Sequence, residues 1–200
     1  MEVLLLSGGI ESTCLAFMRR PDVCLTVDYG QVVARSEIAA AKNIAGHLGL
    51  FHQILTVDLS DLGSGQLAGR PEIAQAPIPE FWPYRNQMLV TLAAMRFAGQ
   101  DGLVISIGTA KGDEAHRDGT PQFVDKLGSI LAMQEGGATL VAPAVNLESI
   151  DFLLKSNIDA DLLDMTFSCF LADFPCGRCR GCVKNEYLRA TYFEHHPSCH

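Results

Sequence analysis

The chain has 200 residues, of which 48% are hydrophobic and 19% are charged, and its formal net charge at pH 7 is −8. These values are typical of a folded globular protein and argue against disorder. The negative charge argues against non-specific binding to DNA or RNA, which requires many basic side chains, so a small-molecule substrate is favoured and direct nucleic-acid binding is not expected.

Strand and helix patterns alternate along the chain. Short apolar runs predict strands, and alanine, isoleucine and leucine at helical spacing predict helices. The predicted strands cover residues 3–6, 23–27, 52–57, 103–107 and 139–141. The predicted helices cover residues 12–19, 34–48, 86–97, 121–133, 147–154 and 184–192. Repeated strand–helix units predict an α/β fold, a Rossmann-like parallel sheet with helices on both faces.

A stretch rich in glycine, proline and serine, about residues 60–84, interrupts this alternation. A loop of that length in a compact domain is usually functional or mobile. No uncharged apolar run approaches the roughly 18 residues that would span a bilayer, so we expect no membrane partner. We expect one α/β domain over residues 1–165 and a small unit packed on it over residues 166–200.

Four cysteines lie close together near the C-terminus: Cys169, Cys176, Cys179 and Cys182. Thiolates at this spacing can close a tetrahedral site, and we expect a structural Zn²⁺ because four soft ligands suit it and leave no position for chemistry. Disulfides are disfavoured, because the total of seven cysteines is odd and no signal-peptide pattern opens the chain. A reducing cytoplasm fits best. A redox or iron–sulfur site and inert thiols are the open alternatives.

The segment Ser7-Gly8-Gly9, which we call the glycine turn, follows the first predicted strand. Parallel sheets bind ligands at the carboxyl ends of their strands, and glycines let the backbone approach an anion closely. The next helix would direct its N-terminal N–H groups to the same place, and Ser12 and Thr13 would add hydroxyl donors. The turn therefore predicts a phosphate site, although a plain strand–helix connection would have the same pattern.

Residues 7–13, SGGIEST, resemble the Ser-Gly-Gly-x-Asp-Ser pyrophosphate loop of the N-type ATP pyrophosphatases, the PP-loop superfamily with an adenine nucleotide alpha hydrolase-like fold. More closely, the chain resembles the QueC family of queuosine biosynthesis. Further segments carry this match in order along nearly the whole chain: VDYGQ at 27–31, Arg85-Asn86, Ile107-Gly108 with Asp113, PQF at 121–123, and the four-cysteine group preceded by Ser168.

Members of that family use ATP and ammonia to convert 7-carboxy-7-deazaguanine into 7-cyano-7-deazaguanine. The resemblance implies an ATP-dependent carbon–nitrogen ligase that uses Mg²⁺, carries a zinc knuckle and forms a homodimer. It implies that the residues holding ATP are Ser7, Gly8, Gly9, Glu11, Ser12 and Thr13 at the phosphates, and Asp28, Tyr29 and Gly30 near the adenosine or the substrate mouth. It implies that the catalytic residues are Arg85, Asn86 and Asp113.

The sequence departs from the family pattern at three places. Glu11 replaces the usual aspartate, Ser149 stands where the pattern has a lysine, and residues 109–120 are one residue short. Lys111 or Lys155 could take over from that lysine. These departures leave alternatives open: a relative that stops at the amide, one that conjugates the deazaguanine to another amine such as a protein in anti-phage defence, or a nucleotide-binding protein without turnover. The net charge disfavours a further alternative, tRNA thiolation.

Overall fold

The computed structural model describes residues 1–111 and 116–196. A five-stranded sheet lies at its centre, with the strands in the order β3-β2-β1-β4-β5 and every neighbouring pair parallel. The strands are β1 (Glu2–Leu5), β2 (Val23–Asp28), β3 (His52–Thr56), β4 (Val104–Ser106) and β5 (Thr139–Val141). The predicted Rossmann-like parallel sheet is confirmed.

The helices connect these strands and extend the chain beyond the last of them. They are α1 (Ile10–Arg19), α2 (Ala34–Leu48), α3 (Gly65–Ala68), α4 (Arg85–Arg96), α5 (Pro121–Ala132), α6 (Ser149–Ser156), α7 (Ala160–Asp164) and α8 (Arg180–His195), with 3₁₀ turns at Ser60–Leu62 and Arg117–Gly119. In the part of the chain that the structure describes, no helix has both the length and the apolar character to cross a membrane.

The helix α2 and the strand β5 have the bounds that the sequence predicts, whereas α8 begins four residues earlier. The early start has a local cause. The Cys179 side chain caps the helix by accepting a hydrogen bond from the backbone N–H of Cys182. The helical pattern therefore begins inside the cysteine group, where apolar spacing gives no sign of it. The short helices α3 and α7 and the 3₁₀ turns were not predicted.

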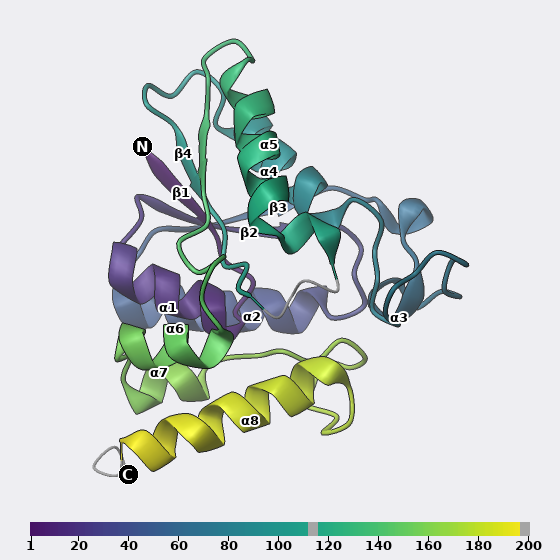
Figure 1. The fold of residues 1–200 in the computed structure, drawn as a ribbon, viewed down its shortest axis with the longest axis vertical. Helices are drawn as coiled ribbons and strands as arrows, with labels where there is room; N and C mark the ends of the chain where they lie inside the picture. The colour runs from purple at the N-terminus through teal and green to yellow at the C-terminus, as the bar shows by residue number, and fades with distance from the viewer. Residues whose placement is uncertain (112–115, 197–200) are drawn as a thin grey trace.

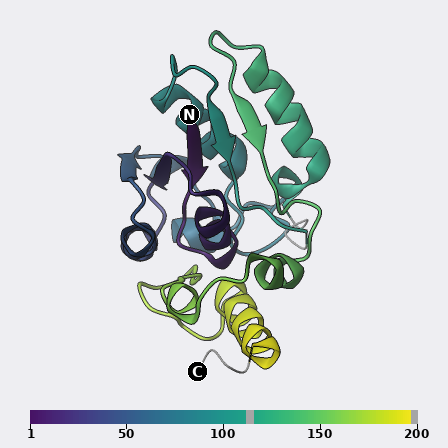
Figure 2. The same ribbon diagram turned by 90° about the vertical axis from the view of Figure 1, so that its left-hand side faces the viewer.

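Helices cover both faces of the sheet. Neighbouring residues of a strand point to opposite faces, so β1 contributes to a core on each side. Leu4 of β1 belongs to a core that it shares with residues of α1, α2, α6, α7 and α8. Val3 belongs to the opposite core, which contains residues of α4 and α5. Figures 1 and 2 accordingly show α8 and α5 at opposite ends of the molecule, with α1 between them.

The C-terminal part of the chain returns to the glycine turn. The backbone N–H of Phe167 donates a hydrogen bond of 2.8 Å to the carbonyl of Gly8. Leu188 and Tyr192 of α8 are buried in the core that also contains α1. The C-terminal segment is therefore packed against the first strand–helix unit, while the domain boundary near residue 165 stays a prediction.

The loop between β3 and α4 folds over the carboxyl ends of the strands. Trp82 is almost fully buried and packs edge-on against Tyr29, with ring centroids 4.8 Å apart. Two residues earlier, the buried carboxylate of Glu80 contacts the Arg180 guanidinium at 2.9 Å. These two contacts attach the loop to the residue that follows β2 and to the start of α8.

The close packing around Gly181 predicts that adding one methyl group there lowers the stability of the fold. A Cβ atom there would lie 1.8 Å from the carbonyl oxygen of Ser168, whereas at Gly46, inside α2, it would meet nothing within 4 Å. Gly181→Ala should lower the free energy of unfolding by about 2 kcal/mol or more. The matched Gly46→Ala should raise it by roughly 0.5–1 kcal/mol. Urea unfolding measures both, and equal effects would contradict the packing described here.

Candidate active site

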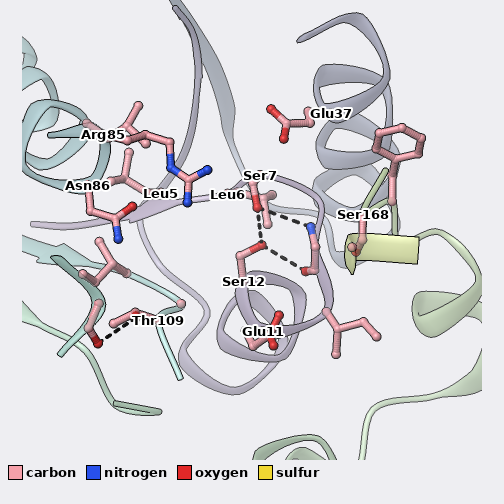
Figure 3. A pocket seen from close by; sticks show the side chains of 18 of the residues that line it. Leu5, Leu6, Ser7, Glu11, Ser12, Glu37, Arg85, Asn86, Thr109 and Ser168 are labelled. Atoms are coloured by element: carbon pink, nitrogen blue, oxygen red, sulfur yellow. Dashed lines mark hydrogen bonds between the residues drawn. The ribbon is translucent and has the colours of Figure 1, made fainter. Parts of the chain in front are cut away.

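A cavity of about 490 Å³ opens at the carboxyl ends of β1 and β2 and beside the segment that follows β4 (Figure 3). Its walls also include the start of α1, the start of α4 and part of α8. This volume is within the range of small-molecule sites, and the position is where parallel sheets bind ligands. The cavity is therefore the candidate active site.

The two glycines of the glycine turn have different roles. Gly8 has a φ of +81°, and a Cβ atom there would lie 2.7 Å from the Cβ of Ala40 in α2. Gly9 has a φ of −77°, which any residue can adopt, and it lines the cavity. Gly8 is thus required by the backbone and by its packing on α2, whereas Gly9 leaves space in the cavity.

Hydroxyl groups surround the glycine turn (Figure 3). The Ser7 and Ser12 hydroxyls lie 3.3 Å apart, and the backbone N–H of Gly9 donates to Ser7 Oγ at 3.4 Å. Ser12 and Thr13 both donate to the carbonyl of Gly9, at 3.0 and 2.8 Å. Thr13 is fully buried, so it stabilises the turn from behind, while Ser7 and Ser12 line the cavity.

Two acid–base pairs connect α8 to the rest of the cavity wall. Lys184 Nζ lies 2.7 Å from Glu11 Oε1, and the Ser149 hydroxyl donates to the same oxygen at 2.7 Å. Arg180, one helical turn before Lys184, contacts Glu80. Both basic side chains come from the same face of one helix, since residues four apart are neighbours on a helix.

A third group of charges lies across the cavity, around Arg85 at the start of α4. In Figure 3 the Arg85 guanidinium points into the space between Glu37 and Ser7. Burial raises the pKa of Glu37 to about 7, although the hydrogen bond of 2.7 Å from Gln31 and the charge of Arg85 oppose this rise. Burial also raises the pKa of Tyr29, again opposed by Arg85. Arg85 is thus held between a phenol and a titratable carboxyl.

The four C-terminal cysteines form a compact group outside the cavity. Their Sγ atoms all lie within 4.8 Å of one another, with 3.9 Å between Cys176 and Cys182 and 4.0 Å between Cys169 and Cys179. A tetrahedron with Zn–S bonds of about 2.3 Å has edges of about 3.8 Å, so the group fits such an ion. The four cysteines are thus brought together as predicted, in a group that could hold a metal ion.

Comparisons with known proteins show the family of this chain. The sequence model of a family described as "Queuosine biosynthesis protein QueC" matches residues 1–195. The chain belongs to the QueC family. A protein of Desulforudis audaxviator named 7-cyano-7-deazaguanine synthase is 32% identical to it over 94% of this chain and 96% of the relative. Relatives of the same name from Nitrosospira multiformis and Acinetobacter baylyi are 32% and 29% identical, covering 96% and 90% of this chain and 90% and 86% of their own lengths.

Most of the residues that the QueC resemblance implied lie together. Those that line the cavity are Ser7, Gly9, Glu11, Ser12, Tyr29, Arg85 and Asn86. Asn86 is fixed by Asp118, which accepts a hydrogen bond of 3.0 Å from its backbone N–H. Those outside the lining are Gly8, Thr13, Asp28 and Gly30. Asp28 accepts a hydrogen bond from the N–H of Gly30 and so shapes the turn after β2. Asp113 lies outside the described residues.

Sequence reasoning missed several charged residues of this QueC cavity. Those are Glu37, Glu80, Arg180 and Lys184. Of the two lysines proposed as substitutes, Lys111 pairs with Glu148 at 3.1 Å and Lys155 is exposed, and neither lines the cavity. Arg180 and Lys184 share a face because they are four residues apart in α8, but the predicted helix began only at residue 184, so the sequence pattern did not indicate this pairing.

The raised pKa of Glu37 predicts a pH-dependent stability. In the folded protein the Glu37 carboxyl stays protonated up to about pH 7, whereas an ordinary glutamate, with a pKa of 4.5, loses its proton at lower pH. The folded state therefore binds more protons between these values, and Glu37 makes the free energy of unfolding fall as pH rises from about 5 to 7. Glu37→Gln removes this loss, so its free energy of unfolding relative to that of the wild type should rise by roughly 2–3 kcal/mol between pH 5 and pH 8.

Urea unfolding at both pH values measures this gain. Glu186→Gln, which removes an exposed carboxylate from α8, is the control for a change of surface charge. A difference between wild type and Glu37→Gln that stays constant with pH would contradict the assignment.

Proposed function

We propose that this chain is an ATP-dependent ligase that converts 7-carboxy-7-deazaguanine into 7-cyano-7-deazaguanine with ammonia. The observation that carries the proposal is the single cavity lined by the glycine turn, the N-terminus of α1 and the basic side chains of α4 and α8. The names of its relatives support the same activity. Such a site suits a reaction in which negative charge develops on phosphate groups.

The chemistry explains why phosphate binding is needed. A carboxylate is a poor electrophile, so one of its oxygens attacks the α-phosphorus of ATP, and the bond to the β-phosphate oxygen breaks with its electron pair leaving on pyrophosphate. Ammonia then adds to the activated carbonyl carbon, loses a proton, and displaces AMP to form the amide. A second ATP activates the amide oxygen in the same way, and loss of AMP and of the two remaining N–H protons leaves the nitrile.

The cavity residues divide naturally between these steps. Ser7 and Ser12, with the N–H groups at the start of α1, would hold the phosphates together with Mg²⁺ supplied with ATP. Arg85 would hold the substrate carboxylate or the transferred phosphate, because its planar guanidinium offers two parallel N–H donors. Glu37 supports this role by facing that guanidinium. The roles of Asn86 and Asp113, the homodimer and a protein acceptor stay predictions.

We also infer that the ion held by the cysteine group is structural Zn²⁺. Four thiolates satisfy a tetrahedral ion completely, so such a site binds no substrate. The group begins just after the segment that contacts Gly8, and Cys179 caps α8. Zinc would therefore hold the start of α8 in the position that brings Arg180 to the cavity.

The reaction can be tested directly. The purified protein should form AMP, the amide and the nitrile when it is incubated with ATP, Mg²⁺, ammonia and 7-carboxy-7-deazaguanine, followed by mass spectrometry. Gly9→Val should abolish this turnover and weaken ATP binding by at least about 30-fold, roughly 2 kcal/mol. Its side chain would enter the cavity, and the backbone there already has a conformation that valine favours.

Calorimetry and thermal unfolding separate the possible outcomes of the Gly9→Val experiment. A folded Gly9→Val protein with unchanged ATP affinity would refute the phosphate site. Gly8→Val is the contrasting variant, and it should lower stability because of the positive φ and the contact with Ala40. Amide without nitrile, or deazaguanine attached to a protein amine, would replace the proposed product with one of the alternatives.

The zinc assignment predicts one tightly bound ion per chain. Cys176→Ser should lose most of this zinc, because one of four ligands is removed and the segment has little apolar core of its own. Cys24→Ala removes a buried cysteine of β2 far from the group and should keep the zinc. Elemental analysis of protein purified without chelators measures both, and a wild-type protein free of zinc would refute the assignment.

A further inference from the structure

We propose that Lys184, on the C-terminal helix α8, is a phosphate-binding catalytic residue of the cavity. The proposal rests on the function proposed above and extends it, because it assigns a charged contact with the reacting phosphates to the C-terminal unit. The residue was not identified from the sequence.

The position of Lys184 is fixed by Glu11. The Lys184 ammonium lies 2.7 Å from Glu11 Oε1, and Glu11 is the second residue of α1. The ammonium therefore lies beside the first turn of α1, where free backbone N–H groups and the helix dipole favour an anion. Its side chain is 38% exposed and that of Glu11 is 15% exposed, so the cation is the more accessible member of the pair.

The charges of the cavity show why this cation matters. A carboxylate at the start of α1 would repel a phosphate bound to the same turn, and Lys184 neutralises it. An ammonium has three N–H donors, so contact with Glu11 is compatible with contact to a phosphate oxygen. Among the basic residues of the described lining, Arg180 contacts Glu80 and Arg85 lies near Glu37 and Tyr29. Lys184 is then the cation on the α1 side.

Ser149 connects this arrangement to a departure in the sequence. Its hydroxyl, at the start of α6, donates to the same Glu11 oxygen that Lys184 contacts. A serine carries no charge, and the family pattern described above has a lysine at this position. The two side chains thus meet at one carboxylate from two different helices. The positive charge beside Glu11 is therefore supplied by α8, and residue 149 of α6 is a second position from which a lysine could supply it.

This geometry defines an experiment in which the charge is removed and then returned from the other helix. Lys184→Ala should weaken binding of inorganic pyrophosphate with Mg²⁺ by roughly 10- to 100-fold and slow AMP formation at saturating ATP by a similar factor. In the double variant Ser149→Lys, Lys184→Ala, the pyrophosphate affinity and the rate of AMP formation should each be at least about tenfold higher than in Lys184→Ala. Lys155→Ala, which removes an exposed lysine from α6, is the control and should change neither. Calorimetry gives the affinities, and zinc content and thermal unfolding report the fold.

Each outcome decides the proposal. Unchanged pyrophosphate affinity and rate in Lys184→Ala would refute it, and so would a folded double variant as defective as the single one. If Lys184→Ala does not fold, the double variant alone is decisive: pyrophosphate affinity near that of the wild type supports the proposal, and a folded protein without it refutes it. If the wild type binds pyrophosphate through Lys184 but makes no product, the proposed reaction is refuted and the phosphate-binding role of Lys184 stands. A wild type that binds no pyrophosphate refutes both.

Discussion

The hydrogen bond between the N–H of Phe167 and the carbonyl of Gly8 is the contact on which the cavity depends. It joins two segments that are far apart in the sequence, and it does so at the turn where β1 passes into α1. Gly8 permits this contact because its positive φ and missing side chain let the turn lie against α2. Ser168 follows directly, and its carbonyl packs so closely on Gly181 that a side chain there would overlap it. Two glycines therefore set how near α8 comes to the first helix.

The charge pairs of the cavity follow from that approach. Each of the two pairs that α8 makes at the cavity takes its base from the C-terminal unit and its acid from an earlier part of the chain: Lys184 with Glu11, and Arg180 with Glu80. Glu80 is almost fully buried, so removing its partner would leave an uncompensated charge away from water. These pairs connect the long loop, α1 and α8 around one space. They make the C-terminal unit a wall of the cavity as well as a support for it.

The opposite wall has a different design. Arg85 is held by Tyr29 and Glu37, and Glu37 in turn accepts a hydrogen bond from Gln31, which follows β2. The Glu37 carboxyl, with a pKa near 7, gains or loses its proton near neutral pH, so the net charge of this wall changes there. The wall around Lys184 faces the glycine turn directly. The cavity therefore lies between a wall whose charge changes near neutral pH and a wall whose two basic side chains are paired with carboxylates.

The amino-acid sequence by itself determined the parts of this protein that depend on neighbouring residues. The alternating strand and helix patterns predicted the parallel sheet, the bounds of α2 were correct, and the spacing of the cysteines predicted a group that could hold a metal ion. The glycine turn and the QueC resemblance were also visible, because both are short patterns in a continuous order. Arg85 was found because Arg85-Asn86 is one of the segments that carry this resemblance.

Only the tertiary structure decided which charges share the cavity. Glu37, Glu80 and Lys184 come from three different segments and meet only after the loop and α8 have packed on the sheet. The sequence suggested Lys111 or Lys155 in place of the lysine that the family pattern has at residue 149. Lys184 contacts Glu11 instead, because the packing of Gly181 on Ser168 brings α8 to the start of α1. Distance along the chain says little about distance in space once helices pack, and the partner of a charge is set by that packing.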